Sequence, residues 1–345
     1  MAAGDAMLAP LVTPVRAGAH AILQMKPSDW LQIVVLAMVW GLSFFLTEIC
    51  LRDLHPLTVA AGRVATAAVA LLAVAVMAGH RLPAGWADWA PLALMGLINN
   101  ALPFSLIMWG QTSIDGGLAS ILNATTPLFA FVLAHFLTSD ERMTRRGALG
   151  ITVGFLGALV LIGPGALAGL QAQSLGQFAV LGAAVCYASA GIYGRRLRHL
   201  SPVVAAAGMT AAAALIMLPL AAWLDRPWTA SPDAATWAAL AALGLVSTAF
   251  AYILYFRILA SAGATNVLLV TFLVPVTALL LGTLILGERI TLLALAGMVL
   301  IFAGLAVIDG RLLRLVRRPR PQSHGAQSLG PESHPPRGGD ATPPS

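Results

Sequence analysis

The sequence is poor in charged residues and contains very little lysine or cysteine. Only 10% of its 345 residues are charged, and a single lysine, Lys26, leaves nineteen of the twenty basic residues as arginine. Two cysteines, Cys50 and Cys186, suggest neither a disulfide framework nor a metal site. The sequence also lacks a Walker sequence, a paired-histidine zinc motif and a nucleophile elbow. These absences argue against an ATP-driven pump within this chain, and we expect no cofactor or metal.

Hydrophobic residues make up 59% of the chain and form runs long enough to cross a membrane. A helical span needs roughly 20 such residues. The runs are rich in Leu, Ala and Val and lack regular polar and apolar alternation, which favours helices over a transmembrane barrel. The sequence therefore predicts an all-α integral membrane protein.

Ten apolar segments are predicted to cross the membrane, five in each half of the chain. They are 31–51, 56–79, 88–109, 115–138, 145–163, 175–194, 202–224, 234–256, 263–286 and 291–309. An odd number in each half means that the second half enters the membrane from the opposite side. We therefore predict two inverted five-helix repeats, 31–163 and 175–309, which follow an N-terminal segment at 1–30.

The two halves also share a pattern of single residues. Pro127 and Pro275 are 148 residues apart, and each is followed by a Glu-Arg pair. The other matches are Glu141-Arg142 with Glu288-Arg289, Gly150 and Gly157 with Gly297 and Gly304, Trp40 with Tyr187, and 101–127 with 249–275. Two copies of a polytopic unit that face each other across a shared cleft are typical of a transporter.

The basic residues indicate the orientation of the predicted spans. With a cytoplasmic N-terminus, sixteen basic residues fall on the inside and only Arg52, Arg226 and Arg289 on the outside. Both termini are then cytoplasmic, and the first helix serves as an uncleaved signal. The net charge of +6 reflects this orientation and contact with anionic lipid rather than nucleic acid. Residues 319–345 are predicted to be a disordered cytoplasmic tail.

Several of these motifs together resemble the EamA family of the drug/metabolite transporter superfamily. They are Trp40-Gly41 with Ser43-Phe44, Pro56 to Arg63, Leu118 to Arg142, and Ala262 to Arg289. In the first half Asp140 holds the spacing that Glu288 holds after its proline, and Glu141 follows one residue later. The resemblance covers residues 31–309. It implies alternating-access transport of a small metabolite across the cell inner membrane, most often export.

Pro127 and Pro275 lie near the middle of the fourth and ninth predicted spans. Proline lacks an N–H and its ring clashes with the preceding turn, so each should bend its helix. Such breaks are where transporters place substrate contacts, although a packing kink is the simpler alternative. Asn123 and Thr271 precede these prolines by one turn. Their side chains either satisfy freed carbonyls, bond to another helix or face a substrate.

Two amides and four aromatic residues complete the predicted substrate site. Asn99 and Asn100 are adjacent and cannot share one helix face, so at least one should point into a polar interior. The aromatic candidates are Trp40, Tyr187, Tyr252 and Tyr255. Aromatic rings that line a cleft suit an amphiphilic or cationic solute, and the alternative is that they only fill space.

Five titratable positions are considered for gating or coupling. Arg63 is the only base more than two residues inside a predicted span and Glu48 the only acid in the first one, and we expect them to pair near the outer mouth. The alternative for Arg63 is snorkelling of its stem toward the surface. His135 could titrate in proton coupling or simply lie at the interface. Glu141 and Glu288 are expected to cap helix N-termini, with gating as the alternative.

These patterns and the resemblance together predict a secondary transporter that exports an amino-acid-like metabolite. Its partners are the solute, membrane lipid and a coupling ion, for which the proton is a candidate. The oligomeric state is left open. The alternatives are import, or a nucleotide or nucleotide-sugar cargo. A lipid-modifying intramembrane enzyme would need a cluster of His, Asp or Glu at one depth, which the predicted spans lack.

Overall fold

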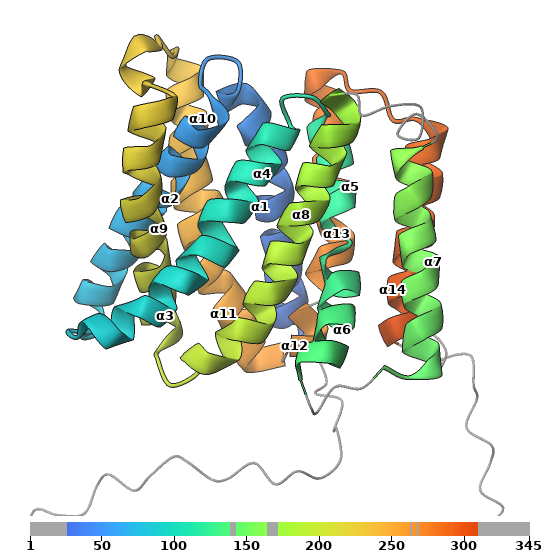
Figure 1. Ribbon diagram of the computed structural model, residues 1–345, viewed down its shortest axis with the longest axis horizontal. Helices are drawn as coiled ribbons and strands as arrows, with labels where there is room; N and C mark the ends of the chain where they lie inside the picture. The colour runs from blue at the N-terminus through green and yellow to red at the C-terminus, as the bar shows by residue number, and fades with distance from the viewer. Residues whose placement is uncertain (1–25, 139–142, 164–171, 263, 268, 310–345) are drawn as a thin grey trace, which may run out of the picture.

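The protein is helical throughout the part of the chain that the structure describes (Figure 1). This computed structural model describes residues 26–138, 143–163, 172–262, 264–267 and 269–309. The all-α prediction is confirmed for these ranges. The predicted tail at 319–345, most of the N-terminal segment, and the acids Asp140 and Glu141 lie outside the described residues.

The helices of the two halves follow the predicted spans in order. The first half contains α1 (Pro27–Cys50), α2 (Pro56–Met77), α3 (Trp86–Gly96), the π-helical turn η1 (Leu97–Ala101), α4 (Leu102–Gly110), α5 (Gly116–Asn123), α6 (Thr126–Leu137) and α7 (Arg145–Ile162). The second half contains α8 (Ala172–Tyr193), η3 (Gly194–Leu197), α9 (Pro202–Leu224), η4 (Pro227–Thr229), α10 (Ala234–Gly244), the π-helical turn η5 (Leu245–Phe250), α11 (Ala251–Ala262), α12 (Ala264–Val267), α13 (Leu269–Leu281), η6 (Gly282–Leu286) and α14 (Leu292–Asp309).

The described helices are long and apolar enough for a multi-pass membrane protein. Nine of them, counting joined segments such as Trp86–Gly110 as one, have the length and composition to cross a bilayer. The last helix is apolar over the shorter range Leu292–Ile308. The count of ten spans and their inverted arrangement therefore remain predictions.

The two halves pack against each other through matching helices. α2 packs on α9, and α7 packs on α14. The contact of α1 with α13 is mirrored by that of α6 with α8, and the contact of α4 with α8 by that of α11 with α1. Each of these contacts therefore has a counterpart when the halves are exchanged, as a duplicated unit requires.

The fourth predicted span is broken at Pro127. α5 ends at Asn123, and α6 begins at Thr126 with Pro127 in its first turn. The hydroxyls of Thr125 and Thr126 donate to the carbonyls of Leu122 (2.6 Å) and Asn123 (2.7 Å). Pro127 has no N–H to donate to the Asn123 carbonyl, so the Thr126 hydroxyl satisfies that acceptor. The Leu122 carbonyl also accepts from the backbone N–H of Thr125 (3.1 Å). The predicted bend is confirmed here, and it leaves the end of α5 beside the centre of the bundle.

The contact between α7 and α14 is made through glycines. A Cβ atom added at Gly150 would lie 2.6 Å from the carbonyl oxygen of Gly304, and one at Gly157 would lie 2.7 Å from that of Gly297. Glycine lets helix backbones approach this closely, so these glycines serve close packing of the two helices. Figure 1 shows these two helices side by side at one end of the bundle.

Candidate functional site

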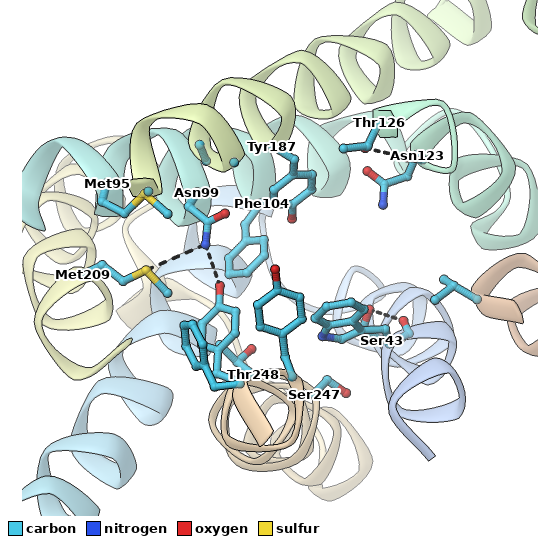
Figure 2. A pocket seen from close by; sticks show the side chains of 18 of the residues that line it. Ser43, Met95, Asn99, Phe104, Asn123, Thr126, Tyr187, Met209, Ser247 and Thr248 are labelled. Atoms are coloured by element: carbon cyan, nitrogen blue, oxygen red, sulfur yellow. Dashed lines mark hydrogen bonds between the residues drawn. The ribbon is translucent and has the colours of Figure 1, made fainter. Parts of the chain in front are cut away.

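A cavity of about 680 Å³ lies between the two halves (Figure 2). Helices of both halves line it, including α1, α2 and α5 from the first and α8, α11 and α13 from the second. It runs from Thr47 and Gln111 at one end to the segment 195–202, which joins α8 to α9, at the other. Its volume is typical of small-molecule sites.

Seven of the ten residues predicted to contact a substrate line this cavity. They are Trp40, Asn99, Asn123, Tyr187, Tyr252, Tyr255 and Thr271. Asn100, Pro127 and Pro275 do not line it. Pro127 lies in the first turn of α6, and α13 runs through Pro275 without a break. The positions one turn before the prolines therefore face the cavity, while the prolines themselves shape the helices.

The adjacent amides Asn99 and Asn100 have different surroundings. Asn99 lines the cavity and its Nδ2 donates to the hydroxyl of Tyr252 (3.1 Å). The Tyr252 hydroxyl donates in turn to Oδ1 of Asn100 (2.6 Å), which is completely buried. Asn100 thus fixes the position of the Tyr252 hydroxyl. Asn99 presents its amide to the cavity, as Figure 2 shows.

Aromatic rings form much of the remaining wall. The ring centroids of Trp40 and Tyr255 lie 5.9 Å apart at an interplanar angle of 37°. Tyr187 and Phe104 extend toward the same space from α8 and α4 (Figure 2). This wall gives a solute apolar contact area with polar hydroxyl tips at its edge.

Arg63 places a buried cation in the cavity. Its side chain is only 6% exposed, and its Nε donates to the hydroxyl of Thr248 (2.8 Å). One terminal nitrogen lies 3.5 Å from the carbonyl oxygen of Ser247. The guanidinium carbon is 3.9 Å from the ring centroid of Phe104, a cation–π geometry. The partners that hold Arg63 in place are thus all neutral, and none of them supplies a counter-charge for the guanidinium.

The pairing predicted between Glu48 and Arg63 does not form in the described part of the chain. Arg63 contacts Thr248, whereas the Glu48 carboxyl lies at hydrogen-bonding range of Glu288. Thr47 lines the cavity, and Glu48 is the next residue on the same helix. At 3.6 residues per turn the Glu48 side chain points about 100° away from that of Thr47, and Glu48 itself does not line the cavity.

The charge lining the cavity is entirely basic. None of the described lining residues is Asp or Glu, and the charged ones are Arg63, Arg195 and Arg198. His135 is not among the lining residues, and its Nδ1 accepts a hydrogen bond from the backbone N–H of Met143 (3.1 Å). A buried guanidinium without a neighbouring carboxylate favours a ligand that carries one.

Sequence reasoning missed Ser247 and Thr248, which both line the cavity and contact Arg63. They lie in η5 and are the counterparts of Asn99 and Asn100 in η1, because the two pairs are 148 residues apart, as the two prolines are. π-helical turns are frequent at functional sites. The offset between repeats was the signal in the sequence that could have identified them.

Comparison with known proteins matches both halves to one family. The profile described as the EamA-like transporter family matches residues 30–163 and again residues 174–309. The two matches together cover nearly all of the residues that form the helices described above.

Individual relatives agree with this match. The chain is 30% identical over 294 residues to a protein named "Probable terminal-alkyne amino-acid exporter" from Streptantibioticus cattleyicolor, with 84% of this chain and 96% of the relative covered. It is 29% identical over 300 residues to a "Probable amino-acid metabolite efflux pump" from Salmonella typhimurium, covering 82% and 95%. Other relatives are named only as uncharacterized transporters. One solved crystal structure has the same fold, with a TM-score of 0.61 at 20% identity over 84% of this chain and 99% of the other.

Proposed function

This chain belongs to the EamA-like transporter family, and on that premise we propose that it is a secondary carrier that exports an amino-acid-like solute by alternating access. The observation that carries the proposal is the buried Arg63 in a cavity whose described lining contains no acid. A bound carboxylate would supply the missing counter-charge. Two relatives whose names refer to amino-acid export support this class of cargo.

The cavity also offers a partner for the amino group of such a solute. The Oδ1 atom of Asn123 is buried and has no donor among the described residues. An ammonium group has three donors and no acceptor, so it would satisfy this oxygen while Arg63 holds the carboxylate. The apolar part of the solute would lie against Trp40 and Tyr255. This arrangement selects a zwitterion with a hydrophobic or aromatic side chain.

The proposed topology rests on two features, and the proposed direction rests on where the cavity ends. Each of the helix contacts described above has a counterpart when the two halves are exchanged. Most arginines fall on the predicted cytoplasmic side of the membrane. These features support inverted repeats with both termini in the cytoplasm. The segment 195–202, where the cavity ends, would then also be cytoplasmic. The conformation described here would therefore load solute from the cell interior, as an exporter must.

A nucleotide or nucleotide-sugar cargo, or import, is the second candidate. The cluster of Arg63, Arg195 and Arg198 along the cavity favours it, because arginine forks also bind phosphate. The family and the names of the relatives point to transport rather than to the lipid-modifying enzyme considered from sequence.

Counterflow in proteoliposomes tests the proposed function. Purified protein would be preloaded with one unlabelled solute and offered labelled amino acids, amines, nucleosides and nucleotides. We expect exchange of amino acids with apolar side chains and none of the corresponding amines. Exchange restricted to nucleotides would favour the second candidate, and the absence of exchange for every solute would contradict the carrier proposal.

A further inference from the structure

Two carboxyl groups from different halves meet away from the cavity. Glu48 comes from the C-terminal part of α1, and Glu288 from the segment that follows η6. Their carboxyls lie at hydrogen-bonding range of each other. The Oε2 atom of Glu48 is buried and has no donor among the described residues. A carboxylate oxygen in that position needs a proton donor, and the carboxyl beside it can provide one only if it is protonated.

The surroundings of Glu288 are shaped around its carboxyl. The backbone N–H of Gly117, at the start of α5, donates to its Oε2 (3.2 Å). A Cβ atom added at Gly117 would lie 2.8 Å from the same oxygen, and one added at Gly282 would collide with the carboxyl group itself. The Glu288 side chain therefore fits only because two neighbouring residues have no side chain. The Glu288 carboxyl therefore occupies a defined space, unlike the carboxyl of an acid exposed on a loop.

The local electrostatics favour one proton on this pair. Burial, followed by the hydrogen bond and charge of Glu48, raises the pKa of Glu288 to about 7, while the Gly117 N–H opposes the rise. Asp115, which precedes α5, adds a further negative charge. Arg289 is the adjacent basic residue and is exposed. Two carboxylates in contact cannot both remain ionised without strong repulsion, so one of them retains a proton near neutral pH.

We propose that Glu48 and Glu288 form a proton-binding site that holds one face of the bundle closed. The pair ties α1 and the start of α5 in the first half to the end of the fourth helix of the second half. Figure 1 shows the C-terminal end of α1 and the start of α5 at the face opposite the connection between α8 and α9. The cavity reaches that connection. The proton site thus lies at the end of the bundle opposite that connection.

The effect of pH on this closure has a defined sign. The closed face binds the proton more tightly than the open one would, because the pKa of a separated, hydrated Glu288 carboxyl would return to its ordinary value. The closed state is therefore favoured below neutral pH and is weakened as the pH rises through about 7, where the second carboxylate forms and repels the first. If the proposed function holds, proton release and opening of this face are coupled steps of transport.

Infrared titration of the purified protein tests the site without any solute. We expect a carboxyl C=O band that titrates near pH 7 in the wild type and is lost in Glu288→Gln. In Glu48→Gln the band should titrate at lower pH, because Glu288 stays buried but loses the neighbouring carboxyl. Asp88→Asn, which removes an exposed acid from the start of α3, is the matched control and should keep the band. Gly282→Ala should keep both acids but shift the band toward ordinary carboxyl titration, because the added methyl displaces Glu288.

The outcomes separate this proposal from the carrier proposal. A band that titrates near neutral pH in both glutamine variants, or no carboxyl titrating near neutral pH in the wild type, would overturn the proton site whether or not the protein transports. A titration seen only when sodium is present would also overturn it, since sodium would then be the ligand. If both proposals hold, counterflow should change about tenfold across two pH units centred near 7 in the wild type, and this dependence should be lost in Glu288→Gln.

Discussion

Replacing Arg63 with glutamine is expected to reduce amino-acid exchange at least about 30-fold while the protein stays folded. The substitution removes the only buried charge in the described lining of the cavity, and the loss of one partner from a desolvated charge pair typically weakens binding by about 2–5 kcal/mol. Glutamine can still bond to Thr248, so the packing between α2 and η5 should survive. Counterflow rates, together with elution of the purified variant as a single species, measure the two effects.

Two further variants make this result specific. Arg63→Lys keeps the charge but loses the planar fork and its cation–π contact with Phe104, so an intermediate rate is expected. Arg81→Gln removes an exposed arginine from the connection between α2 and α3 and should leave exchange unchanged. Exchange by Arg63→Gln at the wild-type rate would show that the solute does not depend on this cation.

The largest effect on stability is expected from Gly304→Ala. The new Cβ atom would lie 2.5 Å from the carbonyl oxygen of Gly150 and 2.6 Å from the nitrogen of Gly154. Both are backbone atoms that no side-chain rotation can move aside, so α7 and α14 must separate. Overpacking of this kind typically destabilises by about 1–3 kcal/mol. The unfolding temperature in detergent should fall clearly. It can be measured as the temperature at which the monodisperse protein is lost.

Gly182→Ala is the matched control for this experiment. It makes the same chemical change in α8, where the added Cβ would meet only the Cδ1 atom of Leu106 at 3.5 Å, an ordinary contact. Its unfolding temperature should stay close to that of the wild type. Equal unfolding temperatures for the two variants would show that close approach of α7 and α14 does not contribute to stability.

Sequence patterns predicted the helix positions well, but not the contacts between helices. Hydropathy located the spans, and the repeat placed Asn123 and Thr271 on the cavity side of their prolines. The expected partner of Glu48 was wrong because depth alone placed it near Arg63. The rotation of α1 about its own axis decides the partner, and it turns the carboxyl toward Glu288.

The two prolines show why equivalent sequence positions can differ in structure. The chain breaks before Pro127 but continues as a helix through Pro275. Thr125 and Thr126 supply hydroxyls that satisfy the carbonyls at the first break, whereas Leu273 and Val274 occupy the matching positions before the second proline and have no polar group to offer. The difference depends on local hydrogen bonding rather than on proline itself.

The most direct test of the solute site is a double-mutant cycle between Arg63 and the carboxylate of the solute. Equilibrium binding of an amino acid and of the amine that lacks its carboxyl group would be measured on wild-type protein and on Arg63→Gln. We expect the wild type to prefer the amino acid by at least about tenfold and the variant to bind both equally weakly, so that the two losses are not additive. The same preference for the amino acid in both proteins would place the carboxylate elsewhere and contradict the site proposed here.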